Sequence, residues 1–344
     1  MLMNKGLCWT AIVVGILILV GGITACGGGE TIEPTQDEEI PSIGTEESVR
    51  VATSTAISIT TRGHGLIAFE SYRTGSPLIY VMNADGSEER QLSGGILADL
   101  SPDSLKIVYI SSGRSGNNDI FVMNLDGSDR RNVTNTNANE YHPVWSPDGS
   151  QILFSSDRDG ETGELSATEI YVMFADGGNV RRLTENNAAD GEPRWSPDGL
   201  RIVFYSMRDG ESGDGWDAAE IYTIDADGSN LHRLTNNSVL DVYPAWSPDG
   251  SRIAFVSERD GVMNIYTMKV NGTEVIQITD HPSPESRPAW SPDGKQLAFH
   301  SWQDDPYSVA LYVIDVTDVS GEGRLPERRM IAESGGHPSW SVAR

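Results

Sequence analysis

A five-residue motif, Trp-Ser-Pro-Asp-Gly, repeats along most of this 344-residue chain. Its copies begin at Trp145, Trp195, Trp246 and Trp290, with a degenerate copy at Leu100 and a truncated copy at Trp340. Successive copies begin 44 to 51 residues apart. A period of about 40–50 residues with strand-like content is typical of the blades of a β-propeller. The repeat therefore constrains the fold more than any other feature of the sequence.

Each period contains the same strand and turn signals. After the motif comes a run in which β-branched and aromatic residues alternate, as in residues 201–206, and this pattern predicts a strand. A second such run is followed by an Asp-Gly or Asn-Gly pair, for example Asp176-Gly177, which favours a tight hairpin. A short strand ending in Leu-Thr, as at Leu183-Thr184, comes next. With the strand that leads into the tryptophan, each unit is predicted to be a four-stranded antiparallel meander.

The number of strands predicts how the ring closes. The first unit, beginning near Leu66, has no inner strand before it. The last inner strand, near residues 337–341, has no outer strands after it. We therefore expect the C-terminal strand to complete the first blade, which removes free sheet edges. The predicted fold is all-β, a six-bladed β-propeller of four-stranded antiparallel blades over residues 63–344.

The N-terminal residues 1–25 are typical of a secretory signal peptide, with Lys5 as the positive charge and an apolar stretch behind it. The stretch ends in Ile23-Thr24-Ala25-Cys26, which resembles the lipobox of bacterial lipoproteins. That resemblance implies that Cys26 becomes the lipidated first residue of the mature protein. Two or three acyl chains would then hold it stably on a membrane. An uncleaved signal-anchor helix is the alternative, because about 20 apolar residues can span a bilayer.

Both interpretations place the rest of the chain outside the cytoplasm, on the periplasmic side or at the cell surface. Residues 26–62 contain the lipidated cysteine and a segment rich in Gly, Glu, Thr, Ser and Pro. Such a segment cannot bury enough apolar surface to offset its ordering entropy. We expect it to form a disordered acidic tether.

The charge balance excludes one class of partner. The chain has 50 acidic and 25 basic residues, a net charge of −25. A protein this acidic is repelled by phosphate backbones, so we expect no nucleic-acid partner.

We also expect the propeller to be a monomer that contacts the membrane through its N-terminal lipid.

The motif tryptophans are predicted to lie in the core. A buried Trp removes about 150–250 Å² from water, and five exposed copies would forfeit that stabilisation. Trp216 and Trp302 lie outside the motif in loop-like contexts. These two are the candidates for surface contact.

The order of the signals resembles that of a known family. Pro-x-Trp-Ser-Pro-Asp-Gly, an apolar strand, Arg-Asp-Gly, Ile-Tyr-x-Met, Asp-Gly and Leu-Thr follow one another as in TolB-type, WD-repeat-like propellers. The resemblance covers roughly residues 63–344 and implies a periplasmic propeller that docks an envelope protein. We expect the additional N-terminal α/β domain of the soluble family members to be absent.

No catalytic machinery is recognisable in the repeats. The Gly-x-Ser-x-Gly elbow of hydrolases does not occur, and the six histidines are not paired at metal-ligand spacing. Some pectate-degrading lyases with related repeats hold a metal at the axis, but this chain has no matching set of histidines. We predict no enzyme and no cofactor. The acidic loops at residues 157–164 and 209–214 could hold calcium, although solvated hairpin loops are the favoured interpretation.

The residues before the motif proline are the candidate partner-binding site. They are His142, Glu192, Tyr243, Arg287 and His337. Equivalent positions of successive blades meet around the axis, so we expect these side chains at one mouth of the central channel. The alternative is a solvated rim without a ligand.

The predicted function is a membrane-anchored extracytoplasmic binding scaffold. It would engage a protein or cell-envelope partner through the channel mouth and the loops at residues 157–169 and 207–220, because loops on a rigid ring often carry recognition. The alternative is a glycan- or peptide-processing enzyme of the cell envelope.

Overall fold

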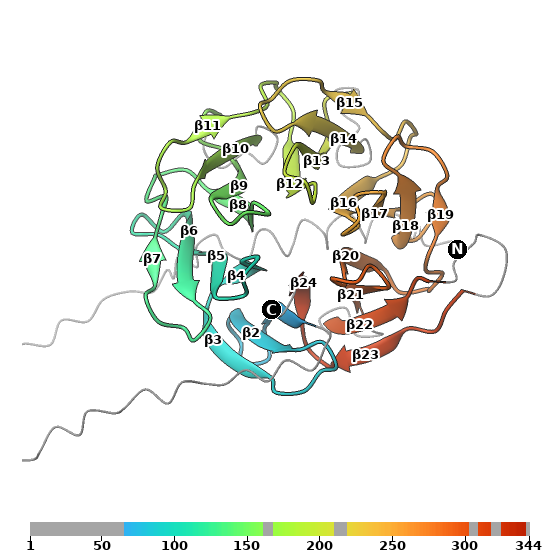
Figure 1. Cartoon of the computed structure of the whole chain (residues 1–344), viewed down its shortest axis with the longest axis horizontal. Coiled ribbons are helices and arrows are strands. Elements are labelled where there is room, and N and C mark those ends of the chain that lie inside the picture. The colour runs from blue at the N-terminus through green and yellow to red at the C-terminus, as the bar shows by residue number, and fades with distance from the viewer. Residues whose placement is uncertain (1–64, 161–167, 210–218, 303–308, 318–324, 342–344) are drawn as a thin grey trace, which may run out of the picture. The chain divides into compact units, whose positions relative to one another are not determined.

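The computed structural model describes residues 65–160, 168–209, 219–302, 309–317 and 325–341, which form a ring of β-sheets (Figure 1). The signal peptide, Cys26 and the tether lie outside the described residues, so the predictions about them stay predictions. Within the described part of the chain, no helix is long and apolar enough to cross a membrane.

Six four-stranded antiparallel sheets surround the axis as blades. From the axis outward, the first blade comprises β24 (Gly336–Ser341), β1 (Leu66–Ser71), β2 (Leu78–Asn83) and β3 (Arg90–Gly94). The second comprises β4 (Ile96–Leu100), β5 (Lys106–Ser112), β6 (Asn118–Asn124) and β7 (Arg131–Asn132). The third comprises β8 (Glu140–Trp145), β9 (Gln151–Ser156), β10 (Glu169–Phe174) and β11 (Arg181–Arg182).

The remaining three blades have the same order. The fourth comprises β12 (Asp190–Trp195), β13 (Arg201–Ser206), β14 (Glu220–Asp225) and β15 (His232–Arg233). The fifth comprises β16 (Asp241–Trp246), β17 (Arg252–Ser257), β18 (Asn264–Lys269) and β19 (Ile276–Gln277). The sixth comprises β20 (Glu285–Trp290), β21 (Gln296–Trp302), β22 (Val309–Asp315) and β23 (Arg329–Ala332). The predicted six-bladed, all-β fold is confirmed.

The C-terminal strand completes the first blade. β24 pairs antiparallel with β1, and the register sets Leu66 opposite Ser341 and Ile67 opposite Trp340. The two ends of the propeller sequence are thereby held in one sheet, next to each other in the ring (Figure 1). The predicted closure is confirmed.

An aromatic pair joins the second and third strands of every blade. In the fourth blade, Phe204 of β13 lies opposite Tyr222 of β14, with ring centroids 6.0 Å apart. The equivalent pairs are Phe69–Tyr80, Tyr109–Phe121, Phe154–Tyr171, Phe255–Tyr266 and Phe299–Tyr312. Phe204 is fully buried, as are the other five residues that second strands contribute to these pairs. The alternation that predicted strands therefore fills the space between blades.

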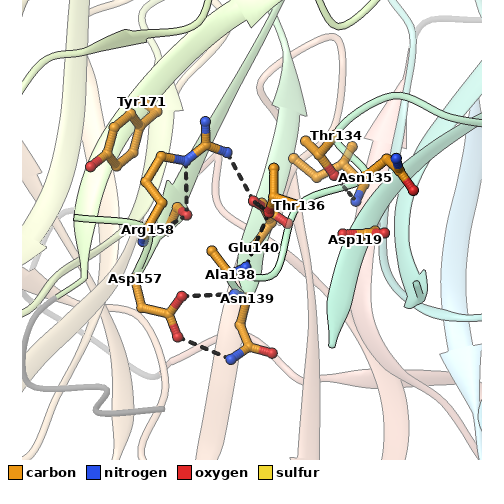
Figure 2. A network of polar contacts seen from close by, with 12 residues as sticks. Asp119, Thr134, Asn135, Thr136, Ala138, Asn139, Glu140, Asp157, Arg158 and Tyr171 are labelled. Atoms are coloured by element: carbon orange, nitrogen blue, oxygen red, sulfur yellow. Dashed lines mark hydrogen bonds and ion pairs between the residues drawn. The ribbon is translucent and has the colours of Figure 1, made fainter. Parts of the chain in front are cut away.

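The repeated arginine loops cover these pairs. In the third blade, the guanidinium of Arg158 lies 4.9 Å from the Tyr171 ring and 2.8 Å from Oε1 of Glu140, the fully buried first residue of β8. Beside it, Asn139 donates its backbone N–H and its side-chain amide to the carboxylate of Asp157 (Figure 2). The same arrangement recurs with Arg208, Asp190 and Tyr222, and with Arg259, Asp241 and Tyr266. The Arg-Asp-Gly repeat thus ties the second strand to the inner strand of its own blade.

The Ser-Pro-Asp-Gly turns of successive blades, from the second blade to the sixth, lie next to one another on one face of the propeller. In the third blade, Ser146 donates its hydroxyl to Asp148, and Gly149 takes the left-handed position with φ of 72°. A Cβ on Gly149 would lie 3.8 Å from Cδ of Pro102 in the preceding turn. In an antiparallel meander, the turn after the first strand and the turn after the third strand lie on the same face. The Asp-Gly turns that follow the third strands, such as Asp176-Gly177, therefore lie on the face of the Ser-Pro-Asp-Gly turns. We call it the turn face.

The prediction that the motif tryptophans are core residues holds fully for two of them. Trp145 and Trp246 are 7% exposed. Trp195, Trp290 and Trp340 are only partly buried. For Trp246 the cover comes from the neighbouring blade, because the guanidinium of Arg201 lies 5.0 Å from its ring. Of the two tryptophans expected at the surface, Trp302 is partly buried with its ring 4.9 Å from His300, and Trp216 lies outside the described residues.

Candidate binding site at the propeller axis

Every inner strand carries one residue in the left-handed region of backbone conformation. The six residues are Leu97, His142, Glu192, Tyr243, Arg287 and His337, with φ between 50° and 56°. The strand register shifts at each of them, for example between Tyr141 and Val144, which is the mark of a β-bulge. A bulge redirects a side chain, and such a conformation costs about 1–3 kcal/mol at a residue other than glycine. Six copies at one level of the ring indicate that the surrounding structure enforces these side-chain directions.

Arg287 reaches across the axis from the sixth blade. Its guanidinium makes a two-pronged contact with Glu192 of the fourth blade, with nitrogen–oxygen distances of 2.8 and 3.0 Å. Its Nη2 also lies 3.3 Å from Nε2 of His142, which is on the opposite, third blade. Nε2 of His142 is in turn 3.0 Å from Glu192 Oε1. The guanidinium lies 4.6 Å from the Tyr243 ring, so four of the six bulge residues form one network that spans the channel.

A second group occupies the side of the axis between the first and sixth blades. Nδ1 of His337 lies 2.6 Å from Oε1 of Glu70, and the backbone N–H of Leu97 donates to the other oxygen of Glu70. The backbone N–H of His337 donates to Nδ1 of His300, and the two imidazole rings are 5.4 Å apart. Glu70 and His300 are only 3% and 4% exposed. The Glu70 carboxylate and Nδ1 of His300 therefore bond to neighbouring groups of this cluster rather than to bulk water.

A deeper polar layer lies two residues farther along the inner strands. Arg194 approaches Asp99 at 3.8 Å, and Asp99 accepts hydrogen bonds from the Ser339 hydroxyl and the Trp145 backbone N–H. This layer combines residues of the first, second, third and fourth blades. The axis cluster is our name for three groups taken together: this deeper layer, the network around Arg287 and the group around Glu70.

Burial and charge shift the pKa values of the axis cluster in opposite directions. Burial alone would raise the pKa of Glu192, but Arg287 and His142 lower it to about 2. Burial lowers the pKa of His142, against the pull of Glu192, and lowers that of His337 and His300 well below the ordinary value. Burial raises the pKa of Glu70. Glu192 is therefore ionised beside Arg287, and burial favours the neutral forms of the three imidazoles and of the Glu70 carboxyl group.

The structure brings all five sequence-predicted site residues to the axis. The sequence reasoning missed Glu70, His300, Asp99 and Arg194. Glu70 and His300 occupy second-strand positions that hold Ile110 and Val256 in other blades. A polar residue within an otherwise apolar alternation was the signal that could have found them.

The sequence-predicted calcium loops fall largely outside the described residues. Asp159 accepts a hydrogen bond from the Tyr171 hydroxyl at 2.6 Å, and Asp209 is bonded to Tyr222 and to Arg233. These two carboxylates are thus held by neighbouring side chains. Among the described residues, no group of three or more His, Cys, Asp or Glu side chains has a geometry suited to a metal ion.

Comparison with known proteins identifies the family of this ring. Residues 96–165 and 212–341, more than half of the chain, match the model of the TolB beta propeller domain. The chain belongs to this family. It is similar to the Tol-Pal system protein TolB of Desulfosudis oleivorans, with 48% identity over 42 residues, which span 12% of this chain and only 10% of that protein.

Two solved structures extend the comparison to about four fifths of the chain. TolB from Acinetobacter baumannii superposes with a TM-score of 0.66 and 25% identity, over 81% of this chain and 67% of that one. An oligogalacturonate lyase in complex with manganese superposes with a TM-score of 0.55 and 19% identity, over 78% of this chain and 74% of the lyase. The second likeness concerns the fold alone.

Proposed function

We propose that this chain is a non-catalytic scaffold outside the cytoplasm, anchored by lipid on Cys26, which binds a protein of the cell envelope at the propeller axis. Its membership of the TolB propeller family supports an extracytoplasmic, protein-binding role. The Tol-Pal assignment of the similar TolB protein gives the kind of partner to expect. The acidic charge of −25 argues against nucleic acid in the same role.

The single observation that carries this proposal is the set of strained bulge residues. The conformation is repeated in all six blades, but the side chains differ: one aliphatic, two imidazoles, one carboxylate, one phenol and one guanidinium. A purely architectural position would be expected to hold similar residues around the ring. Strained backbone that directs varied polar groups to one place is typical of binding sites. Among the described residues, the buried Nδ1 of His142 also has no hydrogen-bond partner, so a ring nitrogen is available there to a ligand, as donor or acceptor according to the tautomer.

The test is affinity capture followed by a direct binding measurement. The protein is immobilised, exposed to detergent-solubilised envelope, and the enriched proteins are identified by mass spectrometry. The His142→Ala/His337→Ala variant removes two axis side chains, and the Leu200→Ser variant is the control because Leu200 is 67% exposed on the turn face. A partner that is retained by the wild type and the control but lost by the axis variant supports the proposal. Equal affinity for all three proteins would overturn it.

The alternative is a glycan- or peptide-processing enzyme. The group formed by Glu70, His300 and His337 is the feature that favours it, since a carboxyl group and imidazoles in contact can transfer protons. Incubation of the purified protein with a panel of envelope polysaccharides and peptides tests this directly. If the wild type turns over one of these substrates and the His337→Ala variant does not, the enzyme function is supported and the non-catalytic scaffold is ruled out.

The lipid anchor needs its own experiment. In the Cys26→Ser variant the acyl acceptor is removed, so metabolic labelling with a fatty acid should fail. The protein should then move from the membrane fraction to the soluble fraction. Unchanged labelling would exclude Cys26 as the site of lipidation.

A further inference from the structure

A cavity of about 460 Å³ opens between the fifth and sixth blades, among the Ser-Pro-Asp-Gly turns of β16–β17 and β20–β21. Its polar lining includes Asp249, Ser251, Arg252, Thr267 and Asp293, and Trp290 provides an aromatic wall. Its volume lies within the range of about 300–1,000 Å³ that is usual for small-ligand pockets. These residues belong to the turn face and are distinct from those of the axis cluster.

The neighbouring blade interface shows what opens this cavity. Between the fourth and fifth blades, Arg201 lies over the ring of Trp246, which is 7% exposed. Arg252 occupies the equivalent position at the start of the next second strand, facing Trp290. It instead donates from Nε and Nη2 to Thr267 Oγ1 at 3.3 and 3.1 Å, and from Nη2 to the Glu274 backbone carbonyl at 3.0 Å. Because these bonds hold the guanidinium at the outer strands, Trp290 is left only partly buried and lines a space.

Trp290 is itself held in place. Its Nε1–H donates to the backbone carbonyl of Ala245 in the preceding blade, at 3.1 Å. The indole nitrogen is therefore satisfied within the protein, and the ring is fixed by the bond. Ile276 and Ile278 of the fifth blade add an apolar surface to the same space. A fixed aromatic wall beside apolar side chains suits a ligand with a hydrophobic ring face.

The charged groups narrow the chemistry of the ligand. Hydrogen bonds from Ser247 and from Ser251 lower the pKa of Asp249, so this carboxylate is ionised at neutral pH. Among the described residues, Arg252 has only neutral hydrogen-bond partners, a hydroxyl and a carbonyl oxygen. Asp249 and Asp293 disfavour an anion in a protein that already carries a net charge of −25. The Arg252 guanidinium offsets one of these two carboxylates and so weakens the attraction for a cation. A neutral ligand with many hydroxyl groups can instead form hydrogen bonds with the carboxylates and with the guanidinium.

We propose that this cavity is a binding site for a neutral saccharide unit, whose ring face packs on Trp290 and whose hydroxyls bond to Arg252, Asp249 and Asp293. Carboxylates accept hydrogen bonds from sugar hydroxyls, and a guanidinium donates to the hydroxyl and ring oxygens. The binding of an envelope glycan on the turn face goes beyond the proposed protein-binding role of the axis. It neither requires that role nor is required by it.

The test uses the full chain and four neutral disaccharides: cellobiose, maltose, N,N′-diacetylchitobiose and lactose. Digalacturonate and spermidine serve as the anionic and cationic comparisons. Binding is measured by ligand-observed NMR and by titration of tryptophan fluorescence. We expect at least one neutral disaccharide to bind more tightly than both charged probes. The Arg252→Gln and Trp290→Phe variants should each raise the dissociation constant of that disaccharide by about tenfold, equivalent to about 1.4 kcal/mol.

The adjacent interface supplies matched controls. Arg201→Gln and Trp246→Phe make the same chemical changes where the arginine already covers the ring, so they should not weaken binding. Glutamine is compatible with the fold at this position, since Gln151 and Gln296 occupy it in other blades. The proposal fails if none of the four disaccharides binds, or if a charged probe binds more tightly than all of them. It also fails if the variants at both interfaces have equal effects.

Discussion

We call the six aromatic pairs that join the second and third strands of the blades the aromatic layer. The aromatic layer and the axis cluster are built from the same sequence repeat, but the layer has the same residue types in every blade whereas the axis cluster does not. In the layer, every blade contributes one phenylalanine and one tyrosine, so the pair Phe204–Tyr222 represents all six blades. At the axis, every blade presents a different environment on an identical bulge. The repeat therefore specifies how blades pack, and departures from the repeat specify what the centre can bind.

The energetic roles of the two regions also differ. The layer is apolar, so its stabilisation scales with the area removed from water. The axis holds charges away from water, so its contribution depends on each charge keeping its partner. Substitutions should consequently show simple losses in the layer and coupled losses at the axis.

The largest effect should follow from opening the aromatic layer. Phe204→Ala removes a fully buried ring and should lower the free energy of unfolding by about 3–5 kcal/mol. Phe174→Ala is the matched control, because Phe174 is 46% exposed and its loss should change stability by no more than about 0.5 kcal/mol. Urea denaturation followed by tryptophan fluorescence measures both. Equal losses would show that the layer is not the main source of stability.

The axis should respond next. Arg287→Leu leaves the Glu192 carboxylate buried without its guanidinium, and we expect a loss of about 3 kcal/mol. In the Arg287→Leu/Glu192→Leu protein both charges are gone, so much of this loss should be recovered. A double-mutant cycle by urea denaturation measures the coupling. Additive losses would contradict the view that the pair acts as a unit.

Much of this contrast could be predicted from the sequence, because a repeat exposes both its rule and its exceptions. The truncated Trp340-Ser341 copy was enough to predict the closure by β24, and alignment of the motifs was enough to bring His142 and Arg287 to the axis. The contact between Arg287 and His142 could not be predicted. It depends on how far a side chain reaches across the ring, a distance that the period does not encode.

The uneven burial of the tryptophans was missed for a related reason. The motif makes Trp246 and Trp290 equivalent, and both are preceded by an arginine at the start of the second strand of the previous blade. Whether that arginine covers the ring or turns to Thr267 depends on side-chain conformation. Local hydrogen bonds of that kind are decided by packing rather than by the repeat.

The fourth and fifth blades differ in the sizes of two residues that face each other across the first and second strands. In the fourth blade Gly191 faces Tyr205, whereas in the fifth blade Val242 faces Val256 at the same register. A Cβ on Gly191 would overlap the Tyr205 ring, so Gly191→Val should cost about 1–3 kcal/mol. Gly191→Val/Tyr205→Val recreates the pair of the fifth blade and should restore most of the stability. Thermal unfolding of the two proteins checks this, and failure of the double variant would show that Tyr205 has a role beyond filling space.

The smallest effect should be a change in pH dependence at the axis. The pKa of Glu192 is lowered to about 2 from the ordinary 4.5, so the unfolded state binds more protons than the folded state between these values. The stabilisation that this carboxylate provides is therefore present above about pH 4.5 and is lost as the pH falls towards 2. The difference in stability between wild type and Glu192→Gln should shrink by about 1 kcal/mol from about pH 4.5 to about pH 3.5, measured by urea denaturation. The same comparison made in the Arg287→Leu background should show a weaker dependence on pH, because Arg287 provides the largest favourable interaction with the ionised carboxylate. If the pH dependence is unchanged in that background, the cross-axis pair does not control the charge of Glu192, and the axis would then resemble the uniform packing of the aromatic layer more than a tuned site.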